Sequence, residues 1–405
     1  EQIILSRNVY VSGAGVVSAA GSNLGETVSS MLRGYSRLAK PERIETRVDS
    51  PVGEVHLSDT ELKTELGINP DEIVSRTVLL GLKAVKEAVQ DAASRGVTLG
   101  DRTVFISGTS VGGMDLSEVF WSAHRQNLEE GNAELLKMHS PGAVTSAMVK
   151  FLVSQDVIDE PSLVSTVSTA CSAAGNAIML GARMIRHGMA DCAIVGGVDS
   201  LCRFTLNGFN SLRILDPEIC RPFREDRAGL NLGEGAGYLV LTAESDRSYC
   251  KVSGWGNANE AYHQTASTPE GIGPGLAMKA ALELAELEPG EIGFVNTHGT
   301  GTQVNDLAES NAMLRVFGGC VPPFSSVKPF IGHTLGASEG IEAALVCKAL
   351  ETNDFVFMRQ VKWGRPVDET GLVPYDGIGL LHVNHAMSSA FGFSGNCVSL
   401  IFSRV

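Results

Sequence analysis

One junction between a strand and a helix organises the chain: Val164-Ser165-Thr166-Val167-Ser168-Thr169-Ala170-Cys171-Ser172-Ala173-Ala174-Gly175-Asn176. β-Branched residues crowd its first part, which is typical of a strand. After a turn, residues 173–184 carry small or aliphatic side chains on nearly every face. This pattern predicts a helix that is buried all round rather than amphipathic. His187-Gly188 is a common helix exit and marks its expected end.

Cys171 is therefore expected at or near the N-terminus of a buried helix. Unpaired N–H groups give that end a partial positive charge, which favours a thiolate over a thiol. The same N–H groups could stabilise an oxyanion formed by attack on a carbonyl. The alternative is that Cys171 is a small core residue, as free cysteines commonly are. This junction alone leaves both interpretations open.

Composition limits the classes of protein to consider. The chain has 405 residues, of which 43% are hydrophobic and 19% charged, enough for a large core and two to three domains. Its formal net charge of -14 argues against nucleic acid and anionic membranes as general partners. No apolar run approaches the roughly 18 to 20 residues of a membrane span. We expect neither a nucleic acid partner nor a membrane span.

The eight cysteines are scattered and form no Cys-x-x-Cys or Cys/His ligand spacing, so no zinc or iron–sulfur site is expected. Such usage suits a reducing compartment, and the first residues lack the features of a signal peptide. We therefore expect a cytoplasmic protein without a bound metal.

Strand-like and helix-like segments alternate along the chain. Expected strands lie at 8–17, 103–109, 164–169, 191–197, 238–241, 251–256, 293–298, 355–357, 380–384, 387–390 and 398–402. Expected helices lie at 23–32, 74–92, 116–126, 139–152, 173–184, 275–285, 307–317 and 338–350. Several helices are too apolar for a surface and need a sheet on both sides. We predict an α/β protein layered α/β/α/β/α, built from two similar halves, residues 1–247 and 248–405.

Three polar clusters follow predicted strands and could converge with Cys171. They occupy residues 296–302, 325–334 and 391–395. Individually they are weak signals, because a lone His is more often structural and Phe-Gly-Phe is more often core. Ser325-x-x-Lys328 also matches a hydrolase pattern, but a pattern this short is usually chance.

Jointly, the motifs resemble those of the elongating (types I and II) β-ketoacyl-acyl carrier protein synthases of the thiolase superfamily. The resemblance runs nearly end to end. Its most specific parts are Ser168-Thr169-Ala170-Cys171-Ser172, Arg221-Pro222-Phe223, Gly233-Glu234-Gly235-Ala236-Gly237, Asn296-Thr297-His298-Gly299-Thr300, Lys328-Pro329-Phe330-Ile331-Gly332-His333 and Phe391-Gly392-Phe393. It implies a thiolase-like fold, with the nucleophile in the first half. The histidines and the loop at residues 391–395, called the gate loop below, lie in the second half.

The resemblance also implies the catalytic roles. Cys171 would hold an acyl chain as a thioester, and the N–H groups of Cys171 and Phe393 would form the oxyanion hole. His298 and His333 would donate Nε2–H bonds to the enolate that forms when malonyl-acyl carrier protein loses CO₂. The product would be a 3-ketoacyl-carrier protein. Lys328 and Glu309 resemble groups that order the histidines, although Lys328 could equally be a structural ion-pair partner.

Substrate contacts follow from the same resemblance. Thr300 and Thr302 resemble residues beside the phosphopantetheine arm of acyl carrier protein, and Phe393 resembles the gate to the acyl pocket. Phe209 would line that pocket, unless it is plain core. No cofactor is implied beyond the phosphopantetheine that carries the substrates. A homodimer is implied, with a heterodimer with a related subunit as the alternative.

The chain departs from the family pattern at Gly301, Arg224, Ala228, Ser394 and Asn396-Cys397. The gate loop is less glycine-rich than usual, which leaves its backbone fewer accessible states. These departures put housekeeping fatty-acid elongation in doubt and favour polyketide-like or aryl-polyene synthesis.

Two other functions compete with the condensing enzyme. A non-catalytic partner subunit could set chain length within a heterodimer, but such partners usually lack the nucleophilic cysteine. A thiolase-like or hydrolytic acyl transferase could use the same Cys171. The pair His298 and His333 argues against it, because in the family this pair serves malonyl decarboxylation.

Overall fold

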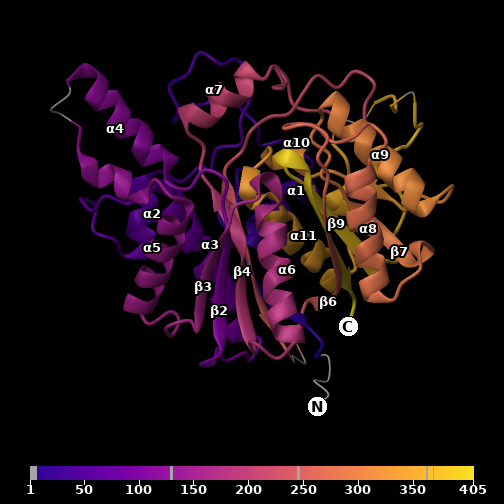
Figure 1. Ribbon diagram of the computed structural model, residues 1–405, viewed down its shortest axis with the longest axis horizontal. Helices are drawn as coiled ribbons and strands as arrows, with labels where there is room; N and C mark the ends of the chain where they lie inside the picture. The colour runs from indigo at the N-terminus through magenta and orange to yellow at the C-terminus, as the bar shows by residue number, and fades with distance from the viewer. Residues whose placement is uncertain (1–6, 128–130, 244–246, 362–363, 368) are drawn as a thin grey trace.

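Ten strands form one hydrogen-bonded sheet in the computed structural model, which describes residues 7–127, 131–243, 247–361, 364–367 and 369–405. The order is β3-β2-β4-β5-β1-β6-β10-β9-β7-β8 (Figure 1). The strands are β1 (Tyr10–Val17), β2 (Thr103–Gly108), β3 (Leu163–Val167), β4 (Cys192–Asp199), β5 (Gly235–Thr242), β6 (Cys250–Asn259), β7 (Ile292–Asn296), β8 (Phe324–Ser325), β9 (His385–Phe391) and β10 (Asn396–Ser403).

The strand order contains a repeat. From one edge the first five strands run 3-2-4-5-1, and from the other edge the last five run 8-7-9-10-6. The second half thus repeats the strand order of the first, with β6 in the position of β1 and so on to β10 in the position of β5. The halves meet where β1 pairs antiparallel with β6, through Tyr10↔Lys251 and Val11↔Cys250. The prediction of two similar halves is confirmed, and the expected boundary near residue 247 falls between β5 and β6.

The helices supply the other layers. They are α1 (Leu24–Arg33), α2 (Asp59–Leu66), α3 (Arg76–Ser94), α4 (Met114–Gln126), α5 (Pro141–Ser154), α6 (Ala173–Arg186), α7 (Arg203–Ser211), α8 (Ile272–Ala285), α9 (Gln303–Phe317), α10 (Lys328–Ile331) and α11 (Ser338–Thr352). Helices α3 and α5 cover the first half, and α8 and α9 cover the second. Helices α6 and α11 lie between and contact strands of both halves (Figure 1). The five strands of each half thus form one β layer, with α6 and α11 between the two layers. The predicted α/β/α/β/α arrangement is confirmed.

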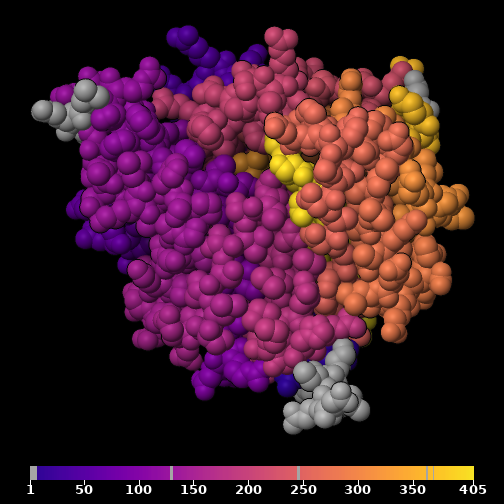
Figure 2. All heavy atoms as spheres, in the orientation of Figure 1, coloured from indigo at the N-terminus to yellow at the C-terminus, as the bar shows by residue number. Residues whose placement is uncertain are grey.

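Close backbone contacts hold α11 in the middle layer. A Cβ atom on Gly237 of β5 would lie 2.2 Å from the backbone nitrogen of Ile341, and one on Gly197 of β4 would lie 2.6 Å from the carbonyl oxygen of Gly336. Real Cβ atoms do not approach so closely, so these strand positions require glycine. The result is a single rounded body in which the two halves are in broad contact (Figure 2).

Two predicted strands are wrong. Residues 356 and 357 belong to a 3₁₀ turn, Val356–Met358, and both Phe357 and the preceding Phe355 are buried. Two buried aromatics two positions apart imitate the alternation of a strand, which explains the error. Residues 380–384 form no regular element, and β9 begins at His385. Leu380 is 86% exposed, so this apolar run does not mark a buried segment.

No helix in the described ranges has both the length and the apolar composition needed to cross a bilayer.

Candidate active site

Cys171 lies in a 3₁₀ turn, Ala170–Ser172, which leads directly into α6, as the sequence predicts. Ala170 adopts a φ of 53°, in the left-handed region that a residue with a Cβ rarely enters. This sharp turn sets Cys171 in the wall of a cavity of about 410 Å³. The residue is only 4% exposed, so its thiol faces the cavity rather than bulk solvent.

The thiol of Cys171 is not an activated thiolate at rest, which corrects the expectation from the helix terminus. Burial raises its pKa to about 12. The charge of Lys328 and the N–H groups of Phe393 and Cys171 lower the pKa, but they do not offset the loss of hydration. At neutral pH the Cys171 side chain is therefore a neutral thiol.

His333 touches that thiol. Its Nε2 lies 3.1 Å from the Cys171 sulfur, and its Nδ1 shares a 2.9 Å hydrogen bond with the Ser338 hydroxyl. Gly332 precedes it with a φ of 81°, and a Cβ there would lie 2.7 Å from the carbonyl oxygen of Leu232. Burial and the charge of Lys328 hold the pKa of His333 well below its usual range, so the imidazole is neutral.

His298 follows the end of β7 and faces His333, with ring centroids 5.2 Å apart and an interplanar angle of 86°. The buried carboxyl of Glu309 accepts hydrogen bonds from the N–H groups of His298 and Gly299, both at 2.8 Å. Glu309 therefore fixes the backbone on which the imidazole is mounted. Burial, Lys328 and His333 together lower the pKa of His298, so it is neutral as well.

Lys328 is paired rather than free. Its Nζ lies 2.8 Å from Oε1 of Glu342, and both side chains are 1% exposed. Asn296 donates a 3.2 Å hydrogen bond to the other oxygen of the same carboxylate. Lys328 is thus an ion-pair partner, one of the two predicted roles, and its charge favours the neutral form of His298 and of His333.

The gate loop lies against Cys171. The backbone N–H of Phe393 reaches the Cys171 sulfur, and the ring of Phe393 stacks on Phe209, with centroids 5.6 Å apart. Ser394 holds a φ of 68°, and its N–H donates a 2.7 Å bond to the carbonyl oxygen of Gln264. This hydrogen bond ties the loop to Gln264, and Phe393 lines the same cavity as Cys171.

The remaining predicted substrate contacts line the same cavity. Thr300 and Thr302 share a 2.9 Å hydrogen bond between their hydroxyls, and Thr302 caps α9 by accepting from the N–H of Asn305 at 3.4 Å. Both threonines line the cavity together with Phe209 and Phe393. The structure therefore gathers around one space side chains that lie far apart in the sequence.

Three supporting residues escaped the sequence analysis as contributors to the site. Ser338 bonds to His333, and Glu342 pairs with Lys328 and accepts a bond from Asn296, which opens one of the predicted polar clusters. Asp199, at the end of β4, accepts hydrogen bonds from neighbouring loops, including the N–H of Gly336 at 2.7 Å. Asp199 alone carried a usable signal, because a carboxylate at a strand exit beside two glycines favours a polar site.

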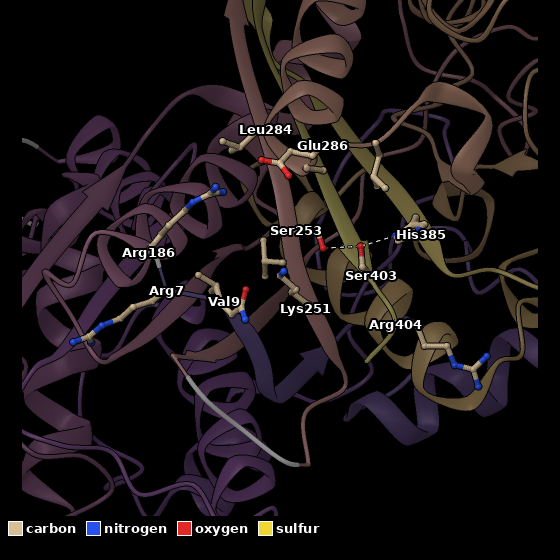
Figure 3. Close-up of a pocket in the computed structure, with 14 residues that line it drawn as sticks. Arg7, Val9, Arg186, Lys251, Ser253, Leu284, Glu286, His385, Ser403 and Arg404 are labelled. Atoms are coloured by element: carbon tan, nitrogen blue, oxygen red, sulfur yellow. Dashed lines mark hydrogen bonds between the residues drawn. The ribbon is translucent and has the colours of Figure 1, made fainter. Parts of the chain in front are cut away.

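A second cavity, of about 370 Å³, lies away from this chemistry (Figure 3). Ser403 links Ser253 and His385 there through hydrogen bonds of 2.6 and 2.7 Å. His385 begins β9, whereas Phe391 at the active site ends it. At the usual strand rise of about 3.3 Å per residue, these two residues are roughly 20 Å apart. This cavity supplies no group to Cys171.

Comparisons with known proteins agree with this geometry. Residues 6–247 match the profile described as "Beta-ketoacyl synthase, N-terminal domain", and residues 249–360 match "Beta-ketoacyl synthase, C-terminal domain". The 3-oxoacyl-[acyl-carrier-protein] synthase 2 of Staphylococcus aureus (strain COL) is 30% identical, over 98% of this chain and 99% of the relative. The Vibrio cholerae protein of that name is 29% identical, over 98% and 99%.

Solved structures give the same result. The ishigamide ketosynthase/chain length factor superposes with a TM-score of 0.87 at 28% identity, covering 99% of this chain and 100% of that chain. A ketosynthase in complex with its chain length factor from Xenorhabdus doucetiae gives a TM-score of 0.81 at 31% identity, covering 98% of each chain. With both halves matched and the sheet repeated, the chain belongs to the β-ketoacyl synthase family.

Proposed function

We propose that the protein condenses an acyl group held on Cys171 with malonyl-acyl carrier protein, with loss of CO₂, to give 3-ketoacyl-carrier protein. The observation that carries this proposal is the meeting of the Cys171 thiol and the imidazoles of His298 and His333 in one cavity. A thiol supplies the covalent carrier, and two neutral imidazoles can supply two donors. No cofactor is required beyond the carrier's phosphopantetheine.

The first step is transfer of the acyl group. The Cys171 sulfur attacks the thioester carbonyl, and the N–H groups of Cys171 and Phe393 stabilise the resulting oxyanion; their hydrogen bonds to the sulfur support this role. His333 Nε2, 3.1 Å from the sulfur, takes the thiol proton and returns it to the departing carrier thiolate. The new bond is the Cys171 thioester, and the bond broken is the carrier thioester.

The second step needs donors instead of a base. Loss of CO₂ from the malonyl group leaves an enolate, whose oxygen accepts N–H bonds from His298 and His333. The Ser338 hydroxyl can donate to or accept from His333 Nδ1, so it supports both tautomers of that imidazole. The carbanion then attacks the acyl-Cys171 carbonyl and forms a carbon–carbon bond, the Cys171 thioester breaks, and the thiolate released takes up a proton from solvent.

The deciding experiment supplies acyl-carrier protein and malonyl-carrier protein and follows the products by mass spectrometry. Wild-type protein should yield 3-ketoacyl-carrier protein, and Cys171→Ala should yield none. In His298→Ala, Cys171 should still be acylated while condensation falls about 10² to 10³-fold, as for loss of an oxyanion donor. A protein that is acylated at Cys171 but forms no ketoacyl product would refute the proposed reaction.

Acyl carrier protein is the partner that this chemistry requires, and we propose a dimer as the working form. Two similar solved structures are a ketosynthase with a chain length factor, which makes a related subunit a candidate second protomer. The chain could itself be such a non-catalytic subunit. In that case Cys171→Ala would leave the activity of the assembled complex unchanged, and a large loss would exclude this role.

We assign the reaction to fatty-acid, polyketide or aryl-polyene-type synthesis. The similarity to ketosynthases that work with chain length factors favours the specialised pathways. We place the protein in the cytoplasm, since its eight cysteines are free thiols.

A further inference from the structure

Asn396 connects the gate loop to the turn that carries the nucleophile. It begins β10, and its Oδ1 accepts a 2.7 Å hydrogen bond from the Ser172 hydroxyl and a 2.8 Å bond from Asn176 Nδ2. Its carbonyl oxygen accepts a 2.7 Å bond from the N–H of Gly392. One residue thus bonds both to the gate loop, at Gly392, and to the residue that follows Cys171.

The side-chain amides of Asn176 and Asn257 make further hydrogen bonds beside Asn396. Asn176 Nδ2 also donates to the Thr169 hydroxyl at 2.9 Å, and Asn257 of β6 donates to Asn176 Oδ1 at 2.7 Å. Asn176 is 7% exposed and Ser172 is fully buried, whereas Asn396 is half-buried and Asn257 is exposed, so the bonds nearest Ser172 are the best shielded from water. Shielded and mutually bonded polar groups hold their geometry better than exposed ones.

The loop and the turn also approach each other closely. A Cβ on Gly392 would lie 2.6 Å from the carbonyl oxygen of Thr169 and 3.2 Å from the Ser172 hydroxyl. Glycine is therefore required for the two segments to come together. Across that contact, the hydrogen bonds of Asn396 set the position of one segment relative to the other.

This contact matters because the proposed oxyanion hole is divided between the halves of the chain. One N–H comes from Cys171 in the first half, and the other comes from Phe393 in the second. A hole built from two segments is effective only while their spacing is fixed, and an error of about 1 Å can cost about 10²-fold in rate.

We infer that Asn396 is a positioning residue that sets the spacing of the two oxyanion-hole N–H groups. This inference rests on the proposed role of Cys171. The working atom is Oδ1, which accepts both short bonds, whereas Nδ2 makes only a 3.5 Å contact with Asn257 Oδ1. A side chain that keeps the acceptor should therefore keep the function.

The test compares two reactions of the same sulfur. Acylation of Cys171 by an acyl-cysteamine thioester forms an oxyanion, whereas alkylation by iodoacetamide does not. Both rates are measured by mass spectrometry of the peptide that contains Cys171. Their ratio at one pH cancels any change in thiolate availability, including the change that a new carboxylate at position 396 would cause.

We expect Asn396→Ala to lower this ratio about 10 to 10²-fold, as for a misplaced oxyanion donor. Asn396→Asp, which keeps the acceptor, should stay close to wild type, as should the exposed control Asn8→Ala. Asn396→Gln moves the amide outward by one methylene and should also lower the ratio, so it replaces Asn396→Ala if that variant does not fold.

The inference is overturned if the ratio is unchanged in Asn396→Ala and Asn396→Gln, or if Asn396→Asp falls as far as they do. It is also overturned if acylation and alkylation slow equally, since that marks a general disturbance of the turn. Failure of the proposed function looks different. There, wild-type Cys171 is not acylated, or it is acylated and no ketoacyl product follows.

Discussion

At Cys171, burial and local charge act in opposite directions on one thiol, and burial prevails. Its pKa of about 12 means that almost all of the thiol is protonated at neutral pH. Because the thiolate is the reactive form, alkylation by iodoacetamide should rise about tenfold per pH unit from about pH 7 to about pH 9. The measurement uses a Cys320→Ser background, since Cys320 is an exposed thiol. A plateau within this range would show that the thiol is activated.

Unlike the thiol reaction, the step that depends on the two imidazoles should not change with pH near neutrality. Burial and nearby charges lower the pKa of His298 and of His333, so the neutral forms persist on the acid side of the ordinary value. Malonyl decarboxylation by acylated enzyme should therefore stay level from about pH 8 down to about pH 6. The rate is followed by CO₂ release. A fall centred on the ordinary imidazole pKa would contradict neutral histidines held by burial.

At the scale of elements, the gate loop between β9 and β10 carries a residue in an unusual conformation. Ser394 sits at a φ of 68°, where a Cβ costs about 1–2 kcal/mol and glycine does not. Replacing Ser394 by Gly widens the backbone states open to the loop, so acyl transfer to Cys171 should speed up or extend to more chain lengths. Acylation rates are measured over a series of acyl thioesters. Rates identical to wild type at every length would refute this role.

Strand β3 forms one edge of the sheet and is partly exposed. Strand β3 pairs with β2 and ends the sheet in the described part of the chain, with Leu163 41% and Val164 37% exposed. An edge that presents unpaired backbone and apolar side chains is a template for pairing with another chain. We therefore expect the proposed dimer to form along β3.

Light scattering during gel filtration tests this expectation. Wild-type protein should have twice the 42.8 kDa chain mass, and Val164→Lys should approach the mass of one chain. A monomeric wild type, or a Val164→Lys variant that remains dimeric, would show that β3 is not the interface.

At the scale of the whole molecule, one buried carboxylate holds distant segments of the first half together. Glu234 is fully buried, forms ion pairs with Arg76 and Arg43, and accepts hydrogen bonds from the N–H groups of Val55 and Leu201. Without Glu234, the buried Arg76 keeps only its ion pair with the half-exposed Asp59, so its charge is incompletely compensated. Glu234→Gln should therefore lower the free energy of unfolding by about 3–5 kcal/mol.

Urea unfolding measures this loss, with Glu65→Gln as the control. Glu65 pairs with Lys83 near the surface, and its loss should cost about 0–1 kcal/mol. The arginines hold the pKa of Glu234 below its ordinary value despite burial. The stabilisation is therefore present above the unfolded-state pKa of Glu and fades as the pH falls below it, so wild type and Glu234→Gln should converge in acid. A constant difference would contradict this.

Much of the architecture could be predicted because it depends on local patterns. Strand and helix periodicity gave the alternation, the buried α6 and the turn that carries Cys171. Polar clusters directly after strands gave His298 and the gate loop, since strand ends are where α/β proteins place their sites. The errors have two causes: residues 355–357 imitate the alternation of a strand, and residues 380–384 are an apolar run that begins with an exposed Leu380.

The sequence by itself determined which groups are present and on which elements they lie, because both follow from neighbouring residues. Only the tertiary structure decided how those groups behave. The contact of His333 with Cys171 joins residues 162 positions apart, and that of Asn396 with Ser172 joins residues 224 apart. The pKa of the thiol likewise depends on how completely the assembled layers exclude water. Burial and distance are properties of the packed chain, so no local pattern records them.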